Sequence, residues 1–152
     1  METMVSRETA DLLNDLVRVN NDRIAGYMRA IEELRPEDMD LNILFVRNID
    51  QSRRFKMVLG TELQAVGGEM DTEASLPGAM YRAWMDFSAA LTAHSRHAIL
   101  TRCVFGEDAA QIIYEHALRS EHLPAHMVST IKEEKELLEQ IREQTVALRD
   151  LS

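Results

Sequence analysis

The stretch that decides the fold is residues 13–38, which read LNDLVRVNNDRIAGYMRAIEELRPED. Its large apolar side chains recur at spacings of four, seven, three, four and three residues, which is the period of one helix face: Leu13, Val17, Ile24, Tyr27, Ile31 and Leu34. Asn20 fills the one gap in this face. The helix ends at Arg35–Pro36, because a residue that precedes proline avoids the α region. We therefore predict a helix over about residues 6–34.

Three further long helices and one short helix follow from apolar spacing together with glycine and proline. We predict them over about residues 38–66, 77–91, 95–120 and 124–151. The last two are joined by EHLP, residues 121–124, so they must run antiparallel, whereas a long connection carrying the short helix precedes them. Short loop, long crossover and short loop are the connectivity of ferritin-like bundles. The predicted fold class is therefore an all-α, ferritin-like four-helix bundle, built as one domain over residues 1–152 with about the first five disordered.

Composition excludes several classes of protein. The chain has 152 residues, of which 45% are hydrophobic and 28% charged, as is typical of a folded domain rather than a disordered chain. Binding to the phosphate backbone of a nucleic acid requires positive charge, whereas this chain has a net charge of −9. We therefore expect no nucleic-acid partner. No apolar run approaches the ~20 residues that cross a bilayer, and no signal peptide is visible. With one cysteine, these features predict a cytoplasmic protein without a membrane partner.

Several short stretches, in order and with similar gaps, resemble an uncharacterised bacterial family of ferritin-like bundles, domain of unknown function 2383. They are Leu13–Leu16, Asn20–Asp22 with Tyr27, Glu62 before Gly67–Gly68, Ala79–Arg82, Trp84–Thr92, and Gly106–Ala110 with Tyr114–Glu115. The resemblance implies a ferritin-like bundle that self-associates, in a family loosely linked to bacterial stress responses. It implies no activity, because the family has none established.

Polar residues interrupt the apolar face of each long helix and predict an interior polar layer. The inward positions are Asn20 in the first helix, Asn48 with Gln51 or Ser52 in the second, Glu107 in the third and Glu134 in the fourth. Buried polar groups need hydrogen-bond partners. We expect Glu107 and Glu134 to bond to Asn20, Gln51 or tyrosine hydroxyls.

The same two carboxylates are the candidates for a metal site. A ferritin-like di-iron centre takes a Glu from each of two helices and a Glu-x-x-His pair from each of the other two. No Glu-x-x-His occurs in this sequence, and Glu134 is followed three residues later by Leu137. Two carboxylates without an imidazole predict a degenerate site with no metal and no other cofactor. The alternative is an atypical site for iron or another divalent metal at Glu107 and Glu134.

The histidines and the cysteine are predicted to carry no chemistry. His94 and His97 are expected to face solvent, and His116, His122 and His126 gather near the turn between the last two helices without forming a functional site. Cys103 is expected in the core, as are Met28, Met57 and Met127.

The short crossover helix predicts self-association. This helix has more large apolar side chains than it needs to cover the bundle. We therefore predict a homodimer face that includes Tyr81, Trp84, Met85 and Phe87. Three functions stay open at this point. The first is a non-enzymatic, stress-associated bundle, the second an atypical metal-binding or redox protein, and the third a protein-interaction module.

Overall fold

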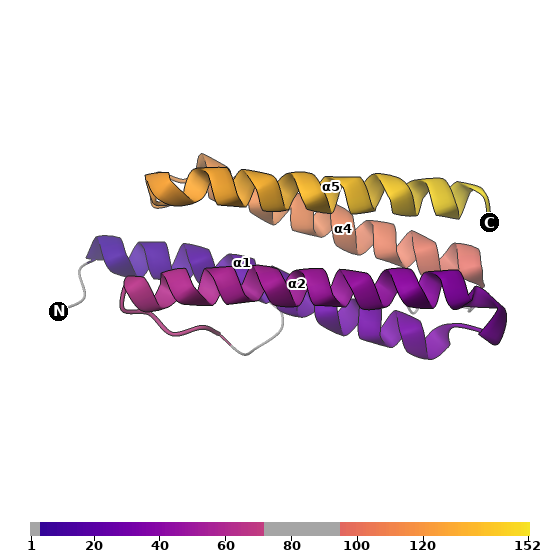
Figure 1. The fold of residues 1–152 in the computed structure, drawn as a ribbon. Coiled ribbons are helices and arrows are strands. Elements are labelled where there is room, and N and C mark those ends of the chain that lie inside the picture. Colours follow the sequence, from indigo (N-terminus) through magenta and orange to yellow (C-terminus); the bar gives the residue numbers. More distant parts are fainter. Residues whose placement is uncertain (1–3, 72–94) are drawn as a thin grey trace.

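Four long helices make up the part of the chain that the computed structural model describes, residues 4–71 and 95–152 (Figure 1). These are α1 (Met4–Glu33), α2 (Met39–Ala65), α4 (Arg96–Arg119) and α5 (Val128–Asp150). Single 3-10 turns, Pro36–Asp38 and Ala125–Met127, precede α2 and α5. Within these ranges the chain contains no strand, so the all-α prediction is confirmed.

The predicted helix limits lie within a few residues of those observed. Helix α1 begins at Met4, two residues before the predicted start. Pro36 stands at the start of the 3-10 turn that separates α1 from α2. After α2, Gly67 adopts a positive φ of 78°, the conformation that favours glycine beyond a helix end. The helix predicted over 77–91 lies outside the described residues.

The direction of the helices follows from contacts at the two ends of the bundle. Arg96, at the start of α4, bonds to Asp38 at the start of α2. At the opposite end, Glu62 near the end of α2 contacts His126, which follows α4. Helices α2 and α4 therefore run in the same direction, while α1 with α2 and α4 with α5 form two antiparallel hairpins (Figure 1).

The core consists of two apolar clusters, one toward each end of the bundle. One contains Leu13, Leu59, Tyr114 and Ile131, and the other contains Tyr27, Phe45, Leu100 and Cys103. Both draw on residues from separate hairpins. The hairpins are thus held together by burial of apolar surface, and each cluster borders buried polar residues near the middle of the helices.

One part of the core prediction is wrong. Met127 is buried, but Met28 and Met57 are 50% and 73% exposed. The reason is helix geometry, because two residues correspond to about 200° of rotation. Met57 therefore points away from the face on which Phe55 and Leu59 are buried.

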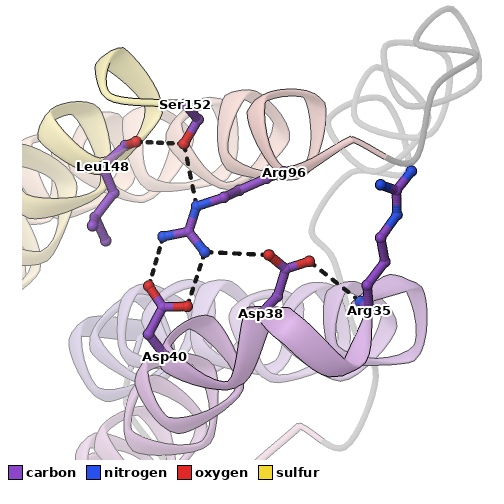
Figure 2. Close-up of polar contacts among 6 residues, drawn as sticks. All are labelled: Arg35, Asp38, Asp40, Arg96, Leu148 and Ser152. Carbon is purple, nitrogen blue, oxygen red and sulfur yellow. Dashed lines mark hydrogen bonds and ion pairs between the residues drawn. The ribbon is translucent and has the colours of Figure 1, made fainter.

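Arg96 joins three chain segments at one end of the bundle (Figure 2). Its guanidinium donates two hydrogen bonds to Asp40, over 2.8 and 2.6 Å, and a third to Asp38 over 3.3 Å. Its Nε donates to the hydroxyl of Ser152 over 3.3 Å. The Arg96 hydrogen bond lowers the pKa of the Asp40 carboxyl. This contact fixes the start of α4 against the start of α2.

We expect Arg96→Ala to lower the free energy of unfolding by about 1 kcal/mol, the upper range for partly exposed pairs. Because the pKa of Asp40 is lowered in the folded state, the contribution is present above the unfolded value of about 3.9 and is lost as pH falls. Urea titrations at neutral and acidic pH measure it. The matched control is Arg119→Ala, which removes an exposed pair with Glu115. Equal losses in the two variants would contradict the assignment.

Candidate functional site

A buried ion pair joins three helices in the middle of the bundle. Arg23 of α1 donates from Nε to Glu107 Oε1 of α4 over 2.8 Å and from Nη1 to the hydroxyl of Ser52 of α2 over 2.6 Å. The side chains of Arg23 and Glu107 are only 3% and 1% exposed. The guanidinium is therefore a cation placed in the protein interior, with its counter-charge in direct contact.

Tyr27 completes this cluster. Its hydroxyl donates to Glu107 Oε1 over 2.6 Å, so this one oxygen accepts from both Arg23 and Tyr27. Burial raises the pKa of Tyr27, and the Glu107 carboxylate raises it further, which keeps the phenol protonated as a donor. Burial alone disfavours a charged guanidinium, but Glu107 outweighs it and the pKa of Arg23 is raised. The cluster is an Arg⁺–Glu⁻ pair with a neutral tyrosine.

A second chain of hydrogen bonds lies beside the first and reaches the fourth helix. Asn20 of α1 donates to the Tyr114 hydroxyl of α4 over 2.9 Å, and that hydroxyl donates to Glu134 Oε1 of α5 over 2.8 Å. Arg23 is close enough to Tyr114 for its charge to lower the phenol pKa, although burial and Glu134 keep that pKa well above its usual range. The two clusters together form a polar layer to which all four helices contribute.

Glu134 differs from Glu107 because it faces no cation among its hydrogen-bond partners. Burial raises the pKa of Glu134 to about 7, against which the Tyr114 hydrogen bond acts in the opposite direction. This carboxyl therefore keeps its proton to a higher pH than a solvated glutamate does. The charge of the Glu107 carboxylate is neutralised by an arginine, whereas burial favours the uncharged, protonated form of Glu134.

The polar residues predicted to point inward are buried or partly buried in the structure. Asn20, Asn48, Glu107 and Glu134 are buried, and Gln51 is partly buried. Asn20 and the two glutamates take part in the hydrogen bonds above. Of the two alternatives in α2, Ser52 contacts Arg23, whereas the side-chain oxygen of Gln51 has no hydrogen-bond partner.

Sequence reasoning missed Arg23. The signal was its spacing, three residues after Asn20 and four before Tyr27, which places all three on one helix face. An arginine at such a position is ordinarily taken as surface, because arginine is almost never fully buried unless it is paired. Its partner lies 84 residues away in the chain.

The arrangement does not fit the di-iron centre of ferritin-like proteins. One oxygen of Glu107 already accepts from a guanidinium, and burial favours the protonated form of Glu134, whose proton a metal would have to displace. In the polar layer, the buried acceptor oxygens without a protein partner include Asn20 Oδ1, Gln51 Oε1, Glu107 Oε2 and Glu134 Oε2. Internal water satisfies such atoms in folded proteins.

Apart from Cys103, the other sequence candidates lie at or near the surface or outside the described residues. His97 contacts the Arg149 carbonyl, His122 lies 2.9 Å from Glu8, and His126 contacts Glu62. His116 is exposed. The Cys103 thiol is buried, and burial raises its pKa, so it is not an activated nucleophile. His94 and the proposed dimer face of Tyr81, Trp84, Met85 and Phe87 fall outside the described ranges.

Comparison with known families places this layer in context. The family described as domain of unknown function (DUF2383) matches residues 8–120. The chain belongs to this family. The resemblance seen in the sequence is thereby confirmed. The DUF2383 match includes Asn20, Arg23, Ser52, Glu107 and Tyr114 but stops before α5, so Glu134 lies outside it. No curated protein matches the chain. None of the described helices is long and apolar enough to span a membrane.

Removing either partner of the ion pair should destabilise this DUF2383 protein strongly. We expect Arg23→Met or Glu107→Gln alone to lower the free energy of unfolding by about 3–5 kcal/mol, because each leaves a buried charge unpaired. The double variant should lose less than the sum of the two, since neither charge then remains. Urea unfolding of all four proteins measures the coupling, with Arg29→Met, at an exposed site on α1, as control. Additive losses would contradict direct pairing.

Glu134 should make stability fall as pH rises toward neutrality. Its folded pKa is raised, so its protonated form supports the fold below the unfolded value of about 4.3, and that support is lost through about pH 7. Glu134→Gln keeps an acceptor for Tyr114 but cannot titrate. Relative to this variant, the wild type should become less stable by about 3 kcal/mol between those limits. Exposed Glu136→Gln is the control. A difference between wild type and Glu134→Gln that does not change with pH would contradict the assignment.

Proposed function

We propose that this DUF2383 chain is a ferritin-like bundle with a non-enzymatic role, in which an arginine supplies the central positive charge that a metal ion supplies in ferritin-like metalloproteins. The observation that carries the proposal is the buried contact between Arg23 and Glu107. A di-iron protein uses its inward carboxylates to neutralise metal cations. Here the inward carboxylate of α4 is neutralised by a side chain of α1.

The direction of the helices supports the ferritin-like part of the proposal. Two antiparallel hairpins with α2 and α4 running the same way require a connection that returns along the length of the bundle. Ferritin-like folds have one such crossover, whereas a simple up-and-down bundle has none.

Charge supports the non-enzymatic part. A divalent ion bound to the second oxygen of Glu107, Oε2, would lie beside the buried guanidinium of Arg23, and the two cations would repel each other. Arg23 is also fixed by Ser52, so moving it would break two hydrogen bonds. The polar layer therefore acts as a structural element that fixes how the two hairpins face each other. Buried polar pairs can serve such specificity, as the position of this one between three helices suggests for this bundle.

Metal titration distinguishes this proposal from the rival function, a metal-binding or redox protein that uses Glu107 and Glu134. We expect chelator-free protein, titrated anaerobically with ferrous iron, to bind well below one equivalent and to show no rise in melting temperature. Near-stoichiometric iron that is lost in Glu107→Ala would overturn the proposal. His122→Ala is the matched control, because the surface contact of His122 with Glu8 can collect adventitious metal.

A cytoplasmic role in bacterial stress responses, implied by the family resemblance, belongs to the same proposal. The buried thiol of Cys103 suits a reducing compartment. Survival of a deletion strain under oxidative stress tests the proposed role in stress responses. Survival equal to that of the parent strain would contradict that role.

A further inference from the structure

Helix α2 is apolar on two faces, and only one of them is buried in the bundle. The inward face carries Leu41, Phe45 and Leu59. On the outward face, Met39, Ile43, Val46 and Met57 are 61%, 54%, 44% and 73% exposed. Large apolar residues gathered on one exposed helix face mark an interaction surface.

The outward residues follow the spacing of a helix-pairing seam. Met39, Ile43, Val46, Asp50, Arg53 and Met57 are separated by four, three, four, three and four residues. This is the alternation that keeps one stripe facing a partner helix in a coiled coil. The two central positions hold opposite charges rather than apolar side chains, so the seam is apolar toward both ends and charged in the middle.

We propose that this outward face of α2 pairs with the same face of a second copy of the chain, with the two α2 helices antiparallel about a two-fold axis. In such a pairing, each contact occurs twice, because residue i meets j and j meets i. A register that places Asp50 opposite Arg53 of the partner subunit also places Val46 opposite Met57 of the partner subunit. The charged layers and the Val46–Met57 layers beside them are then matched.

Charge decides between the two orientations. In a parallel two-fold pair, Asp50 would face its own copy and Arg53 would face its own copy, which is repulsive at both central layers. The antiparallel pair replaces both repulsions with attractions. Within one chain, Arg53 and Asp50 lie 3.7 Å apart and are 60% and 54% exposed, so this loose contact leaves both charges accessible to a partner.

The overall charge also favours this helix as the meeting point. Two chains of −9 repel each other, and contact is least costly where the local charge is not negative. Residues 39–65 carry four Arg or Lys against three Asp or Glu. The proposed surface is separate from the polar layer, so the test of the dimer does not depend on whether Glu107 and Glu134 bind a metal.

A charge-swap cycle on the full-length chain tests the proposed dimer. Sedimentation equilibrium should show a monomer–dimer equilibrium for the wild type. Asp50→Arg and Arg53→Asp should each weaken dimerisation at least about tenfold, and the double variant should restore it, because opposite charges again meet across the axis. Val46→Glu should also weaken the dimer. Ile112→Glu, on an exposed site of α4, is the matched control and should leave it unchanged.

Circular dichroism melts of each variant show that a loss of dimer is not a loss of fold. A wild-type chain that stays monomeric up to millimolar concentration overturns the proposal and leaves the face to a different protein. A double charge swap that fails to restore the dimer, or an equal loss in Ile112→Glu, overturns the antiparallel α2 interface.

Discussion

The contact between Arg23 and Glu107 is the interaction on which the rest of this bundle depends. It places a full positive charge and a full negative charge in the interior, and desolvating each of them costs several kcal/mol. That cost is offset only when α1, α2 and α4 are in the one arrangement that brings Arg23, Ser52 and Glu107 into contact. Apolar side chains alone would tolerate a shifted register much better, since their attraction has no direction.

The two buried glutamates carry the same chemical group, but their surroundings favour different protonation states. Glu107 accepts from Arg23 and Tyr27, whereas Glu134 accepts from Tyr114 and is desolvated without a cation. The first contributes charge to an ion pair. The second retains its proton into the neutral range. One carboxylate is thus paired with a guanidinium and the other favours its protonated form, whereas a di-iron centre binds its metals with ionised carboxylates.

The sequence predicted the helices well because their limits are encoded locally. Pro36, Gly67 and Pro124 interrupt the chain where apolar periodicity stops, and these signals need no tertiary information. The inward polar positions were likewise visible as gaps in apolar faces. Arg23 could not be found in this way, since its burial depends on a carboxylate in another hairpin. Met57 was misplaced because methionine suits a core and a docking face equally well, and only the orientation of α2 distinguishes them.

Crystals grown with excess ferrous iron or zinc decide whether Arg23 or a metal ion neutralises Glu107, because anomalous scattering locates the metal and the electron density of the same crystal locates the Arg23 side chain. We expect no metal peak beside Glu107 or Glu134, and the Arg23 guanidinium within hydrogen-bond distance of Glu107. An anomalous peak beside Glu107 and Glu134, with the guanidinium of Arg23 displaced, would contradict this expectation.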